Sequence, residues 1–515
     1  MIRLGLDFGT TNSSISVYNE DGNLVRETSR MVDEARQPIP SLVAVRMDQW
    51  RHGFDALAVG LDNTGEFSVI KHLKPMLGIR DTVPIDKREY NIADATKRYL
   101  RHLLDEVGVG EGVPFDIVVG TPVRYPREHR VVLRQVLRDL GANSVLFVYE
   151  PTAGLHYALS QDQECGSGPV LVVDWGGGTV DVTISTADRS GKRITDHDVS
   201  ARKDGLGGSD LDNRLLMVLR RDQIIADWVD TQSRADQSRL LLAIERAKIR
   251  MLERSAPAEI KLDVMAPEAI RNRLLLSRQV VEDAALDMVS EVIALCRKAL
   301  VDANLHLEDL SGCLLIGGLF QSVTMRDLFR EQLGPIRPLA IDSRQLSTSR
   351  GCGLLAVQGF ALALAGTLEV GEADGSYLPL IDKDREFPVS VGPISPSKYI
   401  FECENLQDDM AQFVFFMRSH GRGRNRKRVG ELSAEVQSRL RARALSMQTK
   451  GTDVEYDADV VLWVGLDSTL YFTAEACGIR KRAGSDGQSP IEMPRSIAHL
   501  DQLAMQLVYG HGRPA

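Results

Sequence analysis

Two short segments of the sequence resemble each other at a spacing of 167 residues, and this internal repeat constrains the fold more than any other feature. The first is Asp7-Phe-Gly9-Thr10-Thr11, and the second is Asp174-Trp-Gly176-Gly177-Gly178-Thr179. Each segment follows one strand pattern and precedes another, at 14–18 and 182–185. A duplicated unit of this size predicts two similar lobes that face each other across a cleft. The alternative is a chance similarity between two Gly-Thr turns.

Around these repeats, short β-branched runs alternate with helical patterns, an order typical of layered α/β domains. Strands are predicted at 3–7, 14–18, 116–120, 144–148, 170–174, 182–185 and 313–316. Helices are predicted at 94–107, 126–140, 209–229, 234–254, 278–303 and 348–365. We therefore expect one domain over 1–366, with lobe I over about 1–168 and lobe II over about 169–366.

The pattern changes after residue 366. A polar, glycine-containing stretch predicts a linker over 367–388, followed by a small β-rich domain over 389–515. Its strands are expected at 399–404, 412–418, 454–466 and 469–477, with a closing helix near 496–508. The basic block from Arg418 to Arg428 is expected to be a solvated loop, and an anionic partner is the alternative.

Charge and apolar run length exclude several classes of protein. Asp and Glu number 71 against 62 Lys and Arg, and this net charge of −9 disfavours a general nucleic-acid binder. The longest apolar stretch, 353–365, is shorter than the roughly 20 residues that cross a bilayer and is expected to form a buried helix. The first residues show no leader pattern, and the six cysteines form no C-x-x-C pair, so we expect a cytoplasmic location with reduced thiols.

The repeated turns have the chemistry of a phosphate-binding site. Glycines allow backbone N–H groups to surround phosphate oxygens, and threonine hydroxyls add donors. Asp7, at the end of a strand, has the chemistry to hold the water shell of a magnesium ion. A strand follows each turn and no G-x-x-x-x-G-K-[ST] motif is present, which excludes a P-loop ATPase. The alternative is a pair of tight hairpins without a ligand.

Two further glycine pairs follow the repeats. Gly207-Gly208 precedes the predicted helix at 209 and could present N–H groups to a phosphate. Gly317-Gly318 lies between a buried strand and a helix, where it could hold the α-phosphate or the nucleoside. A plain strand-to-helix turn is the alternative for the second pair.

Together these motifs resemble the actin, sugar-kinase and heat-shock ATPase superfamily, and within it the nucleotide-binding domain of DnaK-type seventy-kilodalton heat-shock chaperones. The resemblance covers about the first 366 residues and implies a two-lobed actin-like ATPase domain. The motifs that carry it, in chain order, are those beginning at Leu6, Pro40, Val69, Val119, Tyr149, Val173, Leu206, Glu245 and Gly317.

The resemblance implies roles for individual residues, with ATP or ADP and Mg²⁺ as ligands. Metal binding through water falls to Asp7 and Asp174, and catalysis to Lys71, Glu150, Thr179 and Asp181. Nucleotide contacts fall to Gly9, Thr10, Thr11, Asn12, Gly176, Gly177, Gly178, Thr179, Gly207, Gly208, Glu245, Lys248, Gly317 and Gly318. Pro122 and Arg130 correspond to the switch between the lobes. Without the resemblance, Lys71 would be interpreted as a surface lysine and Glu150 as a helix-capping acid.

The sequence also departs from the family pattern. Leu319-Phe320-Gln321 replaces a polar-Thr-Arg segment, the aspartate expected near Ser347-Thr348 is absent, and Ser209 replaces an acidic residue. The segment from Tyr377 is only a loose substitute for the family's linker. The last 140 or so residues weakly resemble the family's β peptide-binding domain, and they are too few to include its helical lid.

We therefore predict a slow ATPase of chaperone type, whose nucleotide state controls the binding of exposed polypeptide segments by the C-terminal β domain. The family also implies a co-chaperone and a nucleotide exchange factor as partners. The alternative is an ATP-dependent switch or scaffold that docks one dedicated protein. A small-molecule kinase or an actin-like filament is disfavoured by the Glu245–Lys248 element and by the additional β domain.

Overall fold

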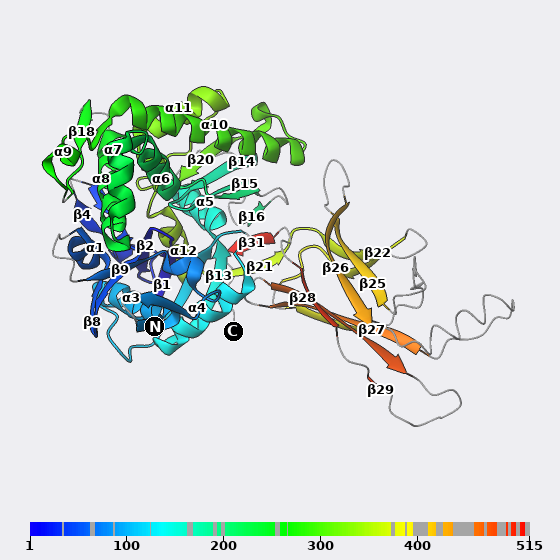
Figure 1. Ribbon diagram of the computed structural model, residues 1–515. Helices are drawn as coiled ribbons and strands as arrows, with labels where there is room; N and C mark the ends of the chain where they lie inside the picture. Colours follow the sequence, from blue (N-terminus) through cyan, green and yellow to red (C-terminus); the bar gives the residue numbers. More distant parts are fainter. Residues whose placement is uncertain are drawn as a thin grey trace. The chain divides into compact units, whose positions relative to one another are not determined.

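The structure is a computed structural model with two compact units, Met1–Phe360 and Ala361–Val508 (Figure 1). It describes residues 1–32, 35–61, 67–85, 88–123, 125–161, 168–188, 193–196, 201–252, 258–264, 266–371, 376–386, 389–394, 410–418, 426–435, 458–467, 471–480, 491–492, 496–500 and 505–509. Among these residues, no helix is both long and apolar enough to span a membrane.

The first sheet of the first unit has the strand order β13-β12-β1-β2-β3, with β6 beside β2. Strand β1 runs parallel to β12 and antiparallel to β2. The strands are β1 (Ile2–Phe8), β2 (Asn12–Tyr18), β3 (Leu24–Glu27), β6 (Ile39–Pro40), β12 (Phe115–Thr121) and β13 (Ala142–Tyr149). Apolar residues on both faces of β1 and β12 are buried, as expected for central strands with covered faces.

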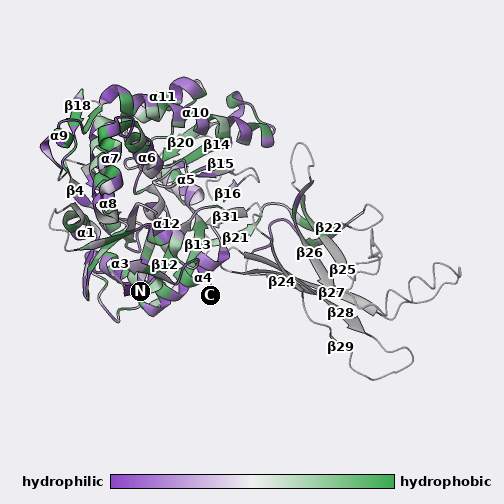
Figure 2. Cartoon of the chain, viewed as in Figure 1, coloured by the Kyte–Doolittle hydropathy of each residue, from purple (hydrophilic) through white to green (hydrophobic). Residues whose placement is uncertain are grey.

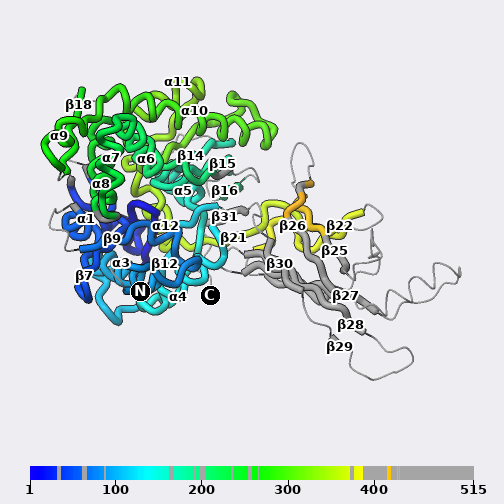
Figure 3. Tube along the Cα trace, in the orientation of Figure 1, coloured from blue at the N-terminus to red at the C-terminus, as the bar shows by residue number. Residues whose placement is uncertain are grey.

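The second sheet repeats this arrangement. Strand β14 runs antiparallel to β15 and parallel to β20. In the same way, β1 runs antiparallel to β2 and parallel to β12. Its strands include β14 (Gly168–Trp175), β15 (Thr179–Ala187), β16 (Arg193–Asp196), β17 (Ala201–Asp204) and β20 (Gly312–Ile316). Figure 3 shows the earlier residues, in blue to cyan, and the later ones, in green, in different halves of this unit. The mixed α/β organisation that the sequence predicts is confirmed here.

Helices of moderate length surround the two sheets. They are α1 (Gly53–Leu61), α2 (Leu73–Met76), α3 (Ile92–Glu106), α4 (Arg127–Asp139), α5 (Glu150–Gln161), α6 (Gly208–Leu219), α7 (Gln223–Thr231), α8 (Arg234–Met251), α9 (Glu268–Arg271), α10 (Arg278–Asp302), α11 (Val323–Leu333) and α12 (Ser347–Gln358). The smaller elements are β4 (Arg30–Val32), β5 (Ala35–Gln37), β7 (Leu42–Arg46), β8 (Gln49–His52), β9 (Ser68–Lys71), β10 (Thr82–Ile85), β11 (Arg88–Asn91), β18 (Glu259–Lys261), β19 (Leu275–Ser277), η1 (Leu307–Asp309) and η2 (Leu319–Gln321).

The largest apolar core lies under the second sheet, where strands β14, β15 and β20 pack against helices α6, α8, α10 and α11. Trp175 and Phe320 meet edge to face at 5.4 Å between ring centroids, and Phe320 meets Phe329 in the same way at 5.3 Å. Helices α10 and α11 alternate between hydrophobic and hydrophilic residues along their length (Figure 2), as one-sided burial requires.

Helix α12 packs against β1 and α5 with very little side chain between the backbones. A methyl group on Gly5 would overlap the backbone of Ser349 and Gly353, and one on Gly351 would overlap the carbonyl of Ala153 on α5. Small residues at these positions are therefore required by the close approach of the chains. The contact fixes α12 and α5 beside the carboxyl end of β1.

The second unit consists of two antiparallel sheets in the described residues. One has the order β23-β22-β25-β26, and the other has the order β24-β27-β28-β29 with β30 beside β28. The strands of these two sheets are β22 (Thr367–Gly371), β23 (Tyr377–Ile381), β24 (Val389–Ile394), β25 (Met410–Arg418), β26 (Arg426–Glu435), β27 (Ala458–Asp467), β28 (Tyr471–Arg480), β29 (Ile491–Glu492) and β30 (Ser496–Leu500). Strands β21 (Phe360–Leu364) and β31 (Met505–Tyr509) belong to neither of them.

The structure differs from the predicted elements in four places. The helix expected over 348–365 ends at Gln358, because Gly359 has a φ of 73°, and strand β21 follows. The helix expected over 209–229 is interrupted between α6 and α7, where the side chain of Asp222 caps a new helix. The linker expected over 367–388 contains β22 and β23, which form one sheet with β25. The closing helix expected near 496–508 contains strands β30 and β31 instead. The strand expected at 399–404 lies outside the described residues.

Candidate functional site

The two repeated turns lie against each other. The turn between β1 and β2 carries Thr10 and Thr11, and the turn between β14 and β15 carries Gly177 and Gly178. A Cβ atom on Gly177 would lie 2.6 Å from the Cβ atom of Thr11, and one on Gly178 would lie 3.4 Å from Cγ2 of Thr10. The lack of a side chain at Gly177 is therefore what allows the second turn to approach the threonines of the first.

The glycine pair at 207–208 joins the second turn through its backbone. The amide of Gly208 donates to the carbonyl of Gly176 at 3.1 Å, and the amide of Ser209 donates to the carbonyl of Gly177 at 2.7 Å. The carboxylate of Asp210 accepts from the amide of Gly207 at 2.8 Å and so caps helix α6. The N-terminus of α6, with its partial positive charge, therefore lies directly beside the second turn.

The fourth predicted loop also reaches this place. Gly317 follows β20 with a φ of 92°, a conformation that favours glycine. A Cβ atom at this position would come within 2.7 Å of Oδ1 of Asp174 and still closer to the backbone of Trp175. Gly318 lies beside the side-chain amide of Gln345. The structure therefore brings together all four glycine-containing loops that the sequence singled out.

Acidic side chains gather where β1 and β14 end. Asp174 on β14 lies directly opposite Asp181 on β15. Burial and the nearby Glu150 raise the pKa of Asp7 to about 7, and Lys74 opposes the rise. Burial, Glu150, Asp7 and Asp181 together raise the pKa of Asp174 well above its usual value. The hydroxyl of Thr179 donates to Asp181 at 3.4 Å.

Lys74 is the cation among these carboxylates, and the sequence analysis did not single it out. Its ammonium nitrogen lies 2.7 Å from Oε1 of Glu150, the first residue of α5, and both side chains are buried. Lys71, which the resemblance placed in the catalytic group, ends β9. Burial lowers the pKa of Lys71, and the charges that act on it are those of Glu245, Asp212 and Lys248. One sign of Lys74 was present in the sequence, because it is the second lysine of the motif that begins at Val69.

The remaining predicted nucleotide contacts lie on helix α8. Lys248 donates to the carbonyl of Gly208 at 2.9 Å and forms a buried ion pair with Asp212 at 2.8 Å. Burial raises the pKa of Asp212 to about 6 although Lys248 lowers it. Glu245 lies one turn earlier on the same helix and is partly buried. Lys248 therefore ties α8 to the start of α6.

The residues present fit a hydrated magnesium ion and phosphate groups. Four carboxylates, those of Asp7, Asp174, Asp181 and Glu150, act on one another around the single ammonium of Lys74. Such an excess of negative charge favours a divalent cation. The hydroxyl of Thr11 is buried without a hydrogen-bond partner, as a donor reserved for a ligand would be. Among the residues described, no group of three or more His, Cys, Asp or Glu side chains is placed to hold a metal ion directly.

Comparison with known proteins finds similarity to one family. A sequence model of the family described as Hsp70 protein matches residues 86–334, a segment that contains Glu150, the β14–β15 turn and all of α8. The chaperone protein DnaK of Mycoplasmopsis agalactiae is 25% identical to the chain over 406 residues, which are 75% of this chain and 65% of that protein. These two matches support a divergent member of the Hsp70 or DnaK type. The chain spans less than two thirds of the length of the curated relative that it matches.

Two departures of this chain from the family pattern have a structural explanation. Phe320 is fully buried between Trp175 and Phe329, so its ring belongs to the core and not to the loop surface. Ser347 and Thr348 are buried in the first turn of α12, where Thr348 lies against Gly120 of β12. Both replacements therefore serve packing.

The basic block from Arg418 to Arg428 is partly neutralised. Glu369 on β22 is buried and accepts from Arg418 and from Arg426, each at 2.6 Å. The guanidinium of Arg426 also lies 3.9 Å from the ring centre of Tyr377. These two arginines are therefore committed within the sheet, and residues 419–425 lie outside the described part of the chain.

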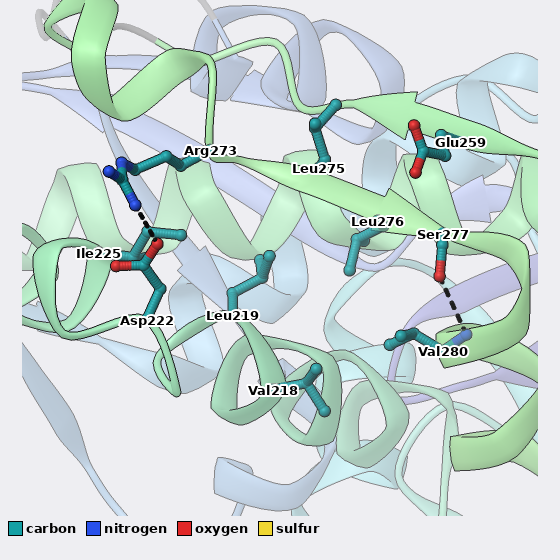
Figure 4. Close-up of a pocket in the computed structure, with 10 residues that line it drawn as sticks. All are labelled: Val218, Leu219, Asp222, Ile225, Glu259, Arg273, Leu275, Leu276, Ser277 and Val280. Carbon is teal, nitrogen blue, oxygen red and sulfur yellow. Dashed lines mark hydrogen bonds and ion pairs between the residues drawn. The ribbon is translucent and has the colours of Figure 1, made fainter.

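A cavity of about 230 Å³ lies elsewhere in the first unit, between α6, α7 and the β18–β19 hairpin (Figure 4). An ion pair between Asp222 and Arg273, 2.7 Å long, forms part of its wall. Its other lining residues are Val218, Leu219, Ile225, Glu259, Leu275, Leu276, Ser277 and Val280. None of the residues predicted for the phosphate site lines this cavity.

Proposed function

We propose that the first unit binds and hydrolyses ATP in the presence of Mg²⁺. The observation that carries this proposal is the approach of the two repeated turns, with Thr11 against Gly177, at the ends of the strands that hold Asp7 and Asp174. Glycine turns, free hydroxyl groups and a helix N-terminus are the groups that bind phosphates in proteins. The match to the Hsp70 family model supports the same activity.

Each group has a proposed task. The hydroxyls of Thr10, Thr11 and Thr179 and the amides of Gly9, Asn12, Gly177 and Gly178 donate to phosphate oxygens. The amide of Gly176 closes the second turn by donating to the carbonyl of Thr179 at 3.0 Å. Asp7 and Asp174 hold the magnesium ion through water, and the ion supplies positive charge to the phosphates. Glu150 and Asp181 orient the attacking water. In phosphoryl transfer most of the acceleration comes from such placement and from charge stabilisation.

The adenosine side of the site is proposed to lie between α8 and the Gly317-Gly318 loop. Lys71, Glu245, Lys248 and Asp212 interact electrostatically there, and Lys248 is already paired with Asp212. We propose that Gly207 and Gly208 serve mainly to bring α6 against the second turn. Pro122 and the buried Arg130 of α4 are proposed to respond to the nucleotide and to move with the lobes.

For the whole chain we propose a chaperone-like function, in which the nucleotide state changes the affinity of the β-rich second unit for exposed polypeptide segments. Transmission requires different peptide affinities in the two nucleotide states. Binding of a panel of fluorescent unfolded peptides in ATP and in ADP tests this proposal, with Thr179→Ala as the control. Several apolar peptides that are released by ATP only when Thr179 is intact would support it.

The same assay decides the alternative. If ATP is hydrolysed and no peptide binds in either nucleotide state, the second unit is a docking module for one dedicated protein. If Mg²⁺-dependent hydrolysis is absent from the purified full chain, the ATPase proposal itself is wrong. A co-chaperone and a nucleotide exchange factor remain proposed partners under the chaperone function.

A further inference from the structure

Asp196, the last residue of β16, is a buried carboxylate that is held by hydroxyl groups. Only 7% of the residue is exposed. Thr152 of α5 donates to its Oδ2 at 2.7 Å, and Ser185 of β15 donates to its Oδ1 at 2.6 Å. Burial raises the pKa of Asp196 to about 6, and in the described residues only these two hydroxyls oppose the rise. A buried charge without a cation is costly, so its presence calls for a functional explanation.

The two hydroxyls come from different lobes. Helix α5 follows β13 of the first sheet, whereas Ser185 lies directly opposite Asp196 in the ladder between β15 and β16 of the second sheet. Helix α5 nevertheless packs against β14, β15 and β16 (Figure 1). A Cβ atom on Gly154 would lie 2.7 Å from Cδ1 of Ile316 on β20, so the helix runs close to this sheet. Asp196 therefore ties the first turn of α5 to the second sheet.

The same turn of α5 carries Glu150. Glu150 is the first residue of the helix, two positions before Thr152, and its charge acts on Asp7 and Asp174. Residues two apart on a helix point in nearly opposite directions, because each residue turns the chain by about 100°. Glu150 can therefore face the acidic site while Thr152 faces Asp196. A shift of this turn would move the Glu150 carboxylate relative to both aspartates.

We propose that Asp196 is a positioning residue, which acts through Thr152 to set the place of the Glu150 carboxylate relative to the second turn. The assignment rests on the proposed ATP hydrolysis, in which Glu150 orients the attacking water. Asp196 takes no part in bond formation or cleavage. Hydrogen bonds to a charged acceptor are stronger than those to a neutral one, so the carboxylate restrains Thr152 firmly. Such restraint matters because a displacement of about 1 Å at a catalytic group can slow a reaction roughly 100-fold.

Single-turnover hydrolysis by the full chain with Mg²⁺ tests the assignment, with ATP affinity and the free energy of unfolding measured separately. Thr152→Val removes the hydroxyl and keeps the size of the side chain. We expect this variant to slow hydrolysis about tenfold or more and to keep ATP affinity within about threefold, because it loosens the turn and leaves the proposed phosphate contacts in place. Thr152→Ser keeps the hydroxyl and should hydrolyse ATP within about threefold of the wild-type rate.

Ser185→Ala is the matched control, because it removes the other hydrogen bond of the same carboxylate. It should lower the free energy of unfolding about as much as Thr152→Val does. Its hydrolysis rate should stay within about threefold of the wild-type rate, since the bond to α5 remains and the ladder to β15 still holds β16. A Ser185→Ala chain as slow as Thr152→Val would overturn the assignment, because lost stability would then explain both rates. A Thr152→Val chain as fast as the wild type would also overturn it.

Thr152→Val leaves a buried carboxylate with one hydrogen bond fewer, which threatens folding. A second comparison therefore uses Asp196→Asn alone and Asp196→Asn combined with Thr152→Val, neither of which carries a charge at position 196. The asparagine amide can still bond Thr152, so we expect the combined variant to be at least about fivefold slower than Asp196→Asn. Equal single-turnover rates in the two proteins would refute the assignment. A wild-type chain that hydrolyses no ATP is a different failure, because it refutes the proposed function and with it the assignment.

Discussion

The junction between Gly207 and the second turn offers a sharp test of the site geometry. A methyl group on Gly207 would come within 3 Å of the backbone of Gly177 and Gly178, where no side chain can rotate away. The start of α6 must then move, and the hydrogen bonds to the carbonyls of Gly176 and Gly177, now 3.1 and 2.7 Å long, must lengthen. Gly207→Ala therefore affects both packing and hydrogen bonding.

The expected magnitude follows from these two effects. Overpacking costs about 1–3 kcal/mol, and weakening two hydrogen bonds adds roughly 1–2 kcal/mol. The total of about 2–5 kcal/mol is a large part of the stability of a typical domain. Gly176→Ala is the matched control, because a Cβ atom there would meet only the carbonyl oxygen of Thr179, at 3.6 Å. We expect little change in stability for this variant.

Two measurements check the prediction. Urea unfolding followed by tryptophan fluorescence reports on Trp175, whose indole donates to the carbonyl of Leu206 across the same junction. Hydrogen exchange of the amides of Gly208 and Ser209 reports on the two lengthened bonds, and a loss of 2 kcal/mol would speed exchange roughly 30-fold. If Gly207→Ala unfolds at the same urea concentration as Gly176→Ala and its amides stay protected, the described contact between the loops is wrong.

Three further substitutions test buried charges. Arg350→Lys should lower the free energy of unfolding in urea by about 2 kcal/mol, because a lysine cannot replace both guanidinium hydrogen bonds to the buried Glu27. Arg36 is the exposed partner of the same carboxylate, and Arg36→Lys should lower it by less than about 0.5 kcal/mol. Burial raises the pKa of Asp196 from 3.8 to about 6, so its ionisation destabilises the folded state as pH rises. The unfolding free energy of Asp196→Asn should therefore rise by about 1 kcal/mol relative to that of the wild-type chain between pH 5 and pH 7. A difference in unfolding free energy that does not change with pH would contradict this reasoning. Lys248→Met should cost about 3 kcal/mol at neutral pH because its carboxylate partner stays buried, and an unchanged urea midpoint would show that the ion pair is not formed.

Much of the first unit could be predicted from local pattern. The repeated turns were recognisable because Gly177 and the threonines of the first turn carry their own structural requirements, and the flanking strands are short apolar runs. Their approach to each other followed from the duplication. The roles of the individual side chains stay proposals, since they depend on a nucleotide that sequence pattern alone does not place.

The elements that were missed depend on long-range partners. The polar stretch from Gly371 to Tyr377 predicts a linker, but the strands on either side of it pair with each other. Glu369 on the first of these strands is neutralised by Arg418 and Arg426, which lie far along the chain. The helix pattern through 348–365 hides a left-handed glycine at 359, after which the apolar residues continue as a strand. Lys74 was overlooked because the turn at His72 changes which lysine faces Glu150, and a left-handed histidine has no reliable signature in sequence.

The contact of α12 with β1 and α5 has a consequence for how this chain can diverge. Because the backbones touch at Gly5 and Gly351, an added carbon at Gly5 forces α12 away from the strand that carries Asp7, and one at Gly351 forces it away from α5. Substitution at these two positions is then limited by the volume of the side chain, whatever chemistry the neighbouring site performs. Among relatives that keep this arrangement, we expect a larger residue at position 5 only together with a displaced or rebuilt α12. We therefore expect the small residues of this helix to be kept wherever the fold is kept, also in chains whose site no longer performs its chemistry.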